Sequence, residues 1–480
     1  MTTRSPLRFL TATAFASLAL ASCAVGPGAP DATLPPSASG AFVGGATPAV
    51  TAQAARDDWW RLYDDPTLDA LIGQALTGNN ELEAASANLR RVRAALGEAR
   101  VGRFPTTTTS AGFTNSRPSA ATQEPGSLPP GANAPESETW DAGLDVSYEI
   151  DLFGRVGSTI RAARADADAA AAALDVVRVS VAAETARAYA DACSANAQIA
   201  VAERTIELQA NSVDLTRRLL DAGSGNGLDT ARARSALETS RASLPPLRAQ
   251  RDGALFRLAT LTGRTPAEAS EAARACRRPP QLSQPIPIGD GAQLLARRPD
   301  VRQAERELAG AAARVNVATA DLYPRITLGG SLGATTGEAD GLGDSENFRF
   351  SVGPLISWSF PNVFAARARI EQASAGSDAG LANFDQTVLV ALQETETALA
   401  NYANELDRRA ALQAARDQAA TAARLSRLRF DAGADSFLSV LDAERTLASA
   451  DAQLAASDAL VTTWQIALFK ALAGGWAGMT

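Results

Sequence analysis

The sequence has no histidine, three cysteines, a single lysine and few aromatic residues, which make up 5% of its 480 residues. Without histidine, the chain lacks the usual general base of serine and cysteine hydrolases and the commonest protein ligand of zinc and haem. The net charge of −8 argues against nucleic acid as a partner, because binding to a phosphate backbone needs a basic surface. We therefore expect no enzyme active site, no metal site and no cofactor.

Two features could be mistaken for catalytic motifs. The glycine-rich segment 223–227 looks like a phosphate-binding loop, but no strand precedes it and the only lysine of the chain is Lys470. We interpret this segment as the turn between two helices. The adjacent carboxylates of Asp57-Asp58 and of Asp64-Asp65 point in different directions, so we interpret them as solvated residues at helix starts.

Long hydrophobic runs are missing as well. The first 22 residues carry Arg4 and Arg8 ahead of an apolar stretch that is too short to span a membrane, which is typical of an export signal. The segment ends in Leu20-Ala21-Ser22-Cys23, which resembles the acylation motif of bacterial lipoproteins; a plain signal peptide with an incidental cysteine is the alternative. We expect a covalent lipid on Cys23, and the resemblance implies sorting to the outer membrane because alanine follows that cysteine. Any further crossing must be a closed barrel, since no other segment is apolar enough for a spanning helix.

The most regular pattern in the chain is a strand. Between residues 140 and 152 every even-numbered position is apolar, and every odd-numbered position is polar or glycine. Side chains alternate along a strand, so one face is apolar and the other is acidic, with Asp141, Asp145 and Glu149. The length suits a transmembrane β-strand, which needs about nine to eleven residues. A long alanine-rich helix begins directly afterwards, at about Arg155, and such a helix is foreign to a soluble β-sandwich.

The chain also contains an internal duplication. Phe104-Pro105 recurs as Tyr323-Pro324, and Asp221-Ala222-Gly223 recurs as Asp431-Ala432-Gly433. Each half predicts the order helix, strand, loop, strand, long helix, glycine turn and return helix. We expect strands near Thr106–Phe113, Trp140–Leu152, Arg325–Ala334 and Phe348–Phe360. We expect helices near 81–103, 155–221, 228–262, 299–321, 364–431 and 438–473, and an apolar seam from Leu381 to Leu406 indicates coiled-coil-like packing.

The expected domains follow from these elements. They are a signal peptide (1–22), a lipidated linker rich in glycine and proline (23–56), a first repeat (57–263), an irregular segment (264–297), a second repeat (298–473) and a tail (474–480). We interpret Trp59-Trp60 as a core anchor, and Pro245-Pro246 should kink or interrupt the first return helix. Four strands are too few for a barrel, for which about eight is the minimum, so the chain must oligomerise. Three copies would supply twelve strands.

These features together resemble a known family. The duplicated plan, the Cys23 motif, Trp59-Trp60 and the segments 148–155 and 297–302 are similar to those of TolC-type outer-membrane efflux lipoproteins of the nodulation-factor-exporter branch. The resemblance implies a mixed α and β membrane protein, a trimeric twelve-stranded β-barrel continuous with a long periplasmic α-helical barrel. It implies the exit duct of a tripartite pump for small molecules such as drugs, with a periplasmic adaptor and an inner-membrane RND-type transporter as partners.

Two alternative functions stay open at this stage. An outer-membrane duct for type I protein secretion has the same fold, and the sequence does not name the cargo. A non-conducting structural lipoprotein with a periplasmic coiled coil is the alternative from a different class of protein. The acidic strand face favours a conduit, because a structural tether needs no water-filled interior.

The resemblance also assigns roles to the two helical hairpins. Their turns form the surfaces that contact the adaptor, namely Ala222, Gly223, Leu228, Ala432, Gly433 and Leu438. The second hairpin lines a constriction in the family, often with aspartates one and two turns into the return helix. Here these positions are Ser439 and Asp442, with Asp435 at the turn. Three copies would form rings of like charge, and Arg427 and Arg445 are candidate partners; ordinary solvated aspartates are the alternative.

Cys193 and Cys276 are the two cysteines that remain if Cys23 is acylated, and an exported protein meets an oxidising compartment. Cys193 precedes the end of its helix by about 28 residues, or about 42 Å. The return helix covers about 53 Å before it reaches the segment with Cys276. Both cysteines should therefore lie at a similar distance from the turn that joins the two helices, which predicts a disulfide between them. Two unpaired buried cysteines are the alternative.

Overall fold

The computed structural model of the chain describes residues 25–28, 30, 33–122, 124, 129, 131–282, 284–358 and 363–473. The expected signal peptide, Cys23 and the expected tail lie outside the described residues. The chain divides into two compact units, each of which draws segments from both halves of the sequence. The first unit takes residues 1–31, 90–168 and 305–382, and the second takes residues 32–89, 169–304 and 383–480. None of the described helices is long and apolar enough to cross a membrane.

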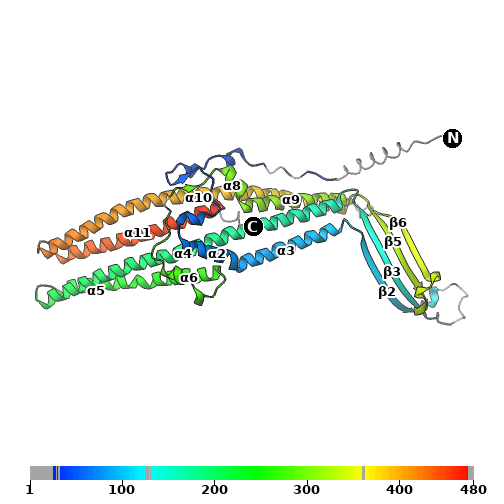
Figure 1. The fold of residues 1–480 in the computed structure, drawn as a ribbon, viewed down its shortest axis with the longest axis horizontal. Helices are drawn as coiled ribbons and strands as arrows, with labels where there is room; N and C mark the ends of the chain where they lie inside the picture. The colour runs from blue at the N-terminus through cyan, green and yellow to red at the C-terminus, as the bar shows by residue number, and fades with distance from the viewer. Residues whose placement is uncertain are drawn as a thin grey trace. The chain divides into compact units, whose positions relative to one another are not determined.

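The first unit contains a four-stranded antiparallel sheet in the order β2-β3-β5-β6 (Figure 1). Its strands are β2 (Thr106–Ser116), β3 (Ser137–Ile150), β5 (Arg325–Thr336) and β6 (Phe348–Ser357). All four expected strands are therefore present, although the end expected for the last, Phe360, lies outside the described residues. The hairpins of the two halves join through β3 and β5, where Asp145 lies opposite Ser331.

The helices follow the predicted duplicated order. They are α2 (Pro66–Gly78), α3 (Asn80–Val101), α4 (Arg155–Asp221), α5 (Gly227–Ala242), α6 (Leu244–Leu261), α9 (Pro299–Ala320), α10 (Val363–Asp431) and α11 (Phe437–Ala471). Both long helices, α4 and α10, match the predicted bounds to within one residue. The predicted interruption is confirmed, because Ser243 separates α5 from α6 and Pro245-Pro246 falls in the first turn of α6, where proline is tolerated.

A short junction switches the chain from strand β3 to helix α4. Gly154 has a φ of 75°, a left-handed conformation that residues with a Cβ rarely adopt. This conformation allows the sharp turn. The carboxylate of Asp151 accepts hydrogen bonds from the N–H groups of Val156 at 2.9 Å and Gly157 at 2.7 Å. These bonds satisfy N–H groups that a helix start leaves without an intrahelical partner, so the sequence itself fixes where α4 begins.

The core of the second unit lies around the predicted tryptophan anchor. Trp59 is 1% exposed and stacks on Phe469 of α11, with 4.7 Å between ring centroids. Trp60 is buried beside it. The predicted seam of α10 is also confirmed within this unit, and its buried members are Phe384, Val388, Thr395, Leu399 and Tyr402.

The expected linker at 23–56 is wrong for its second half, which is packed within the second unit. Residues Val50–Thr51 (β1) pair in parallel with Ile286–Pro287 (β4), and Phe42 is buried. The N–H groups of Val43 and Gly44 donate to the carboxylate of Glu396 at 2.6 and 2.9 Å. Glycine and proline suggested a flexible tether, but here the backbone groups of this segment find partners far away in the sequence.

The expected irregular segment at 264–297 contains several short elements. They are a 3-10 turn η5 (Pro266–Glu268), α7 (Glu271–Ala275), β4 and α8 (Gly291–Arg297). The segment 297–302, which resembles the family, contains two arginines with structural roles. Arg297 donates to the carbonyl of Ala55 and to Asp57, and thereby holds the N-terminal segment. Arg298 is buried and pairs with Asp300 and Glu394 at 2.6 and 2.7 Å.

Candidate functional site

The sheet of the first unit has one polar face and one apolar face across β3, β5 and β6. On the polar face, Asp141 accepts hydrogen bonds from Thr335 at 2.8 Å and Arg349 at 2.7 Å, which links β3, β5 and β6. Further along this face, the hydroxyls of Ser331 and Ser351 lie 2.7 Å apart. The apolar face, as the register places it, carries Trp140, Leu144, Val146, Tyr148, Leu328, Leu332, Phe350, Val352 and Ile356. Such a sheet can separate water from hydrocarbon.

The two edges of the sheet are open. Among the described residues, no further strand pairs with the outer edge of β2 or of β6. An open edge presents unpaired backbone N–H and C=O groups, which in hydrocarbon would be very costly. Additional strands from other copies of the chain would satisfy both edges.

Each long helix ends in the same capped turn, as the duplication predicts. We call residues 222–228 the first tip and residues 432–438 the second tip. Gly223 and Gly433 have φ values of 73° and 72°, so each turn needs a residue without a Cβ. The N–H of Ala434 donates to the carbonyl of Arg429 at 2.9 Å, which closes the second turn. Leu228 and Leu438 are 59% and 50% exposed and give each tip an apolar contact surface.

The structure brings two of the predicted constriction residues together. The carboxylate of Asp435 accepts hydrogen bonds from the Ser439 hydroxyl at 2.8 Å and the N–H of Ser436 at 2.9 Å. Arg429 approaches the same carboxylate at 3.4 Å. The hydrogen bond from Ser439, the backbone bond and the arginine lower the pKa of Asp435 below its ordinary value. Asp442 lies exposed on α11, one helical turn beyond Ser439.

Within one chain, neither Arg427 nor Arg445 forms an ion pair with these aspartates among the described residues, and the pairing predicted for a ring of three copies stays a prediction. Arg427 lies 3.3 Å from Glu444 of α11 and contacts neither Asp435 nor Asp442. None of the ion pairs among the described residues includes Arg445, which instead lines a groove with Leu438. The reason is the direction of the helix faces, because α10 turns the side chain of Arg427 toward the packed face of α11 and not toward its exposed face.

Sequence reasoning missed Glu444. Its carboxylate accepts a hydrogen bond from the hydroxyl of Ser212 on α4 at 2.8 Å, so it links the second hairpin to the first. Burial raises the pKa of Glu444, while the Ser212 bond and the charge of Arg427 act in the opposite direction. The signal in the sequence was its spacing, since Glu444 follows the apolar positions Val440 and Leu441 by four and three residues and therefore shares their face.

The two hairpins pack against each other near the tips. Phe437 and Leu441 of α11 form a buried cluster with Ala233 of α5. Phe430 of α10 contacts Phe437 edge to face, with 5.9 Å between ring centroids. The arrangement fixes the second tip through apolar contacts, and the polar contacts of Asp435 lie at its surface.

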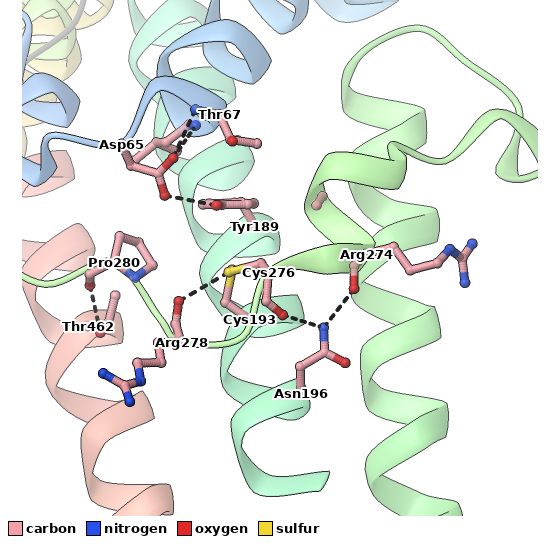
Figure 2. The surroundings of a disulfide bond; sticks show 12 residues. Asp65, Thr67, Tyr189, Cys193, Asn196, Arg274, Cys276, Arg278, Pro280 and Thr462 are labelled. Carbon is pink, nitrogen blue, oxygen red and sulfur yellow. Dashed lines mark hydrogen bonds between the residues drawn. A yellow bond between two sulfur atoms is a disulfide. The ribbon is translucent and has the colours of Figure 1, made fainter. Parts of the chain in front are cut away.

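The structure forms the predicted disulfide between Cys193 and Cys276 (Figure 2). The side-chain amide of Asn196 donates to the carbonyls of Arg274 and Cys276 at 3.1 and 2.8 Å, one turn further along α4. On the other side of the segment, the Thr462 hydroxyl of α11 donates to the carbonyl of Pro280 at 3.4 Å. The segment that follows α7 is thus fastened to one helix from each repeat.

Known proteins resemble this chain in both sequence and structure. The family model described as "Outer membrane efflux protein" matches residues 71–264 and 291–474. The toluene efflux pump outer membrane protein TtgF of Pseudomonas putida is 30% identical over 423 residues, which cover 87% of this chain and 85% of that protein. The pyoverdine export outer membrane protein OpmQ of Pseudomonas putida is 31% identical over 430 residues, which cover 88% of this chain and 90% of that protein.

Solved structures extend the similarity to the whole fold. The structure of the outer-membrane channel OprN aligns with a TM-score of 0.87 and 37% identity, and covers 94% of this chain and 99% of OprN. The open state of the MtrE outer membrane channel of Neisseria gonorrhoeae aligns with a TM-score of 0.82 and 26% identity, and covers 94% of this chain and 98% of MtrE.

Proposed function

Because this chain belongs to the outer membrane efflux protein family, we propose that it is the outer-membrane exit duct of a tripartite efflux pump. The sheet with one apolar and one polar face carries the proposal. The apolar face suits contact with membrane lipid, and the polar face around Asp141 and Asp145 suits the wall of a water-filled passage. A duct of this kind needs no catalytic group, because the energy comes from a separate transporter.

The passage requires several copies of the chain. One chain supplies four strands with two open edges, and three chains would supply twelve strands and pair every edge. We therefore place the chain in a homotrimer whose strands close a barrel. Its long helices would extend as a tube into the periplasm, with α4 and α10 about 100 Å long each.

The tips are the proposed docking points of the other pump components. Exposed Leu228 and Leu438 beside the two glycine turns offer small apolar contacts to a periplasmic adaptor protein. An inner-membrane transporter of the RND type would complete the pump. Small molecules are the proposed cargo, since the names of two relatives refer to toluene and to pyoverdine.

A lipid on Cys23 would add a second membrane attachment. The described chain begins shortly afterwards, and Gly26 lies so close to Asn316 of α9 that a Cβ on the glycine would fall 1.9 Å from the Asn316 amide oxygen. The first described residues therefore lie beside α9. Asn316 lies four residues before the end of α9, and the sheet begins a few residues later at Arg325.

Conductance tests the proposal directly. Purified full-length protein reconstituted into a planar bilayer should form channels, because the polar sheet face would enclose water. A trimer that inserts but does not conduct would contradict the duct and favour a structural lipoprotein.

A further inference from the structure

A charged cavity of about 290 Å³ lies where β5 and β6 meet the start of α10. Its wall includes Asp321 and Tyr323 after α9, Arg325 and Trp358 at the strand ends, and Arg369 on α10. A single ordered water needs only ~10–15 Å³ of such space, so the cavity has room for a much larger group.

Two guanidinium groups share one carboxylate at this cavity. Arg325 donates to Asp321 at 3.0 Å, and Arg369 lies 3.7 Å from the other oxygen of the same carboxylate. The side chains of Arg325 and Arg369 are 51% and 63% exposed, and each guanidinium group has five N–H donors, so both keep donors that Asp321 does not use. The site carries a surplus of one positive charge and can accept an anion.

The indole of Trp358 lines the cavity with these charged groups, and Ile356 and Phe364 are exposed apolar residues close to it in the sequence. Ile356 lies on the apolar face of β6, and Trp358 continues the same alternation two residues later. Their exposed fractions are 66% and 55%, and that of Phe364 at the start of α10 is 81%. The Trp358 indole N–H donates to the carbonyl of Leu322 at 3.3 Å, which fixes the ring at the cavity mouth. Tryptophan in this position is typical of the boundary between hydrocarbon and headgroups.

We propose that this cavity binds the phosphate group of a membrane lipid. Arg325 and Arg369 would donate to the phosphate oxygens, for which the guanidinium fork is well suited. Trp358 and Val363, which line the cavity, would contact the glycerol and the first part of the acyl chains. A free phosphate ion offers the same anionic chemistry but uses none of the apolar wall, which is why we assign the lipid. This inference rests on the proposed function, because only a sheet that spans the membrane brings the cavity to the headgroup layer.

Native mass spectrometry of the delipidated full-length protein in detergent, titrated with phosphatidylglycerol, tests the proposal. We expect saturable binding to the wild type and a loss of affinity of about tenfold or more in the double variant R325Q/R369Q. The matched control is R367Q, which removes an exposed arginine from the same helix end that does not line the cavity, and it should bind as the wild type does.

For a third variant, we expect the affinity for phosphatidylglycerol to change in the opposite direction. In D321N the carboxylate no longer competes for the two arginines, so phosphatidylglycerol should bind several-fold more tightly. A misfolded protein would not gain affinity, so this variant keeps the test valid even if the double variant folds poorly. Equal affinity in the wild type, R325Q/R369Q and D321N would overturn the proposal.

Two further titrations separate the possible sources of the binding. Diacylglycerol, which lacks the phosphate, should bind much more weakly than phosphatidylglycerol, and equal binding would overturn the role of the arginines. Inorganic phosphate should not displace the lipid at equal concentration, and full displacement would overturn the assignment to a lipid. Conductance of the same samples distinguishes this inference from the proposed function, since a conducting wild type whose arginine variants bind lipid normally contradicts only the lipid site.

Discussion

The Cα atoms of Cys193 and Cys276 lie 5.1 Å apart, and a disulfide joins their side chains. It connects the middle of α4 to a segment that also contacts α11 through Pro280 and Thr462. The disulfide therefore holds the segment after α7 on α4, and this segment contacts one helix from each repeat. Without the disulfide, the hydrogen bonds from Asn196 would still connect this segment to α4.

The double variant C193S/C276S should have a lower unfolding temperature than the wild type. The bond closes a loop of 83 residues, and a loop of that length corresponds to roughly 4.5 kcal/mol in the loop-entropy model. Thermal unfolding followed by circular dichroism checks the change, with reduced wild-type protein as the matched control. Equal thiol labelling of denatured wild type with and without reductant would contradict the bond itself.

Glu444 should make stability depend on pH. Burial raises its pKa above the ordinary glutamate value of 4.5. A raised pKa in the folded state contributes stability that is fully present below the unfolded value and is lost as pH rises through the folded value. The unfolding temperature of the wild type should therefore fall relative to E444Q as pH rises above about 4.5. The exposed Glu238→Gln variant serves as the control, and a pH profile of E444Q that runs parallel to the wild type would contradict the assignment.

The turn at the second tip should not tolerate a side chain. Gly433 has a φ of 72°, whereas Gly227 at the start of α5 has an ordinary φ and open space around it. We expect Gly433→Ala to destabilise the hairpin by about 1 kcal/mol and Gly227→Ala to have a much smaller effect. Chemical unfolding measures both variants. An unchanged G433A protein would mean that the turn relaxes into another conformation.

Asp435 and Asp442 should make the periplasmic opening selective for cations. In a trimer each aspartate becomes a ring of three carboxylates, which attracts multivalent cations. The double variant D435A/D442A should lose block by multivalent cations applied from the periplasmic side and still assemble. Single-channel recordings test this, with Asp214→Ala on the first hairpin as an exposed control. Wild-type selectivity and block in the double variant would move the selective site to the acidic sheet face around Asp145 and Glu149.

The mature protein should begin at a lipidated Cys23. Intact-mass measurement of protein purified from the outer membrane should show a chain that starts at residue 23 and carries fatty acid. We expect Cys23→Ser to impair sorting or assembly more than transport, because the barrel itself would hold the trimer in the membrane. An unmodified cysteine in the mature protein would contradict the lipid anchor.

The sequence by itself determined the repeating plan and most element bounds, because their signals are local. Alternation between residues 140 and 152 defines a two-faced strand, and Asp151 with Gly154 sets the start of α4. Glycines at 223 and 433 mark the ends of the long helices, since each adopts a φ that other residues disfavour. The spacing of apolar residues also identified the seam of α10.

Only the tertiary structure decided which distant groups meet. Glu396 accepts the N–H groups of Val43 and Gly44, so a segment with the composition of a tether is in fact packed. The same holds for the pairing of Arg427 with Glu444 and for the approach of Arg369 to Asp321. The physical reason is that periodicity fixes the face on which a side chain lies, whereas its partner depends on the register and rotation of another element far away in the chain.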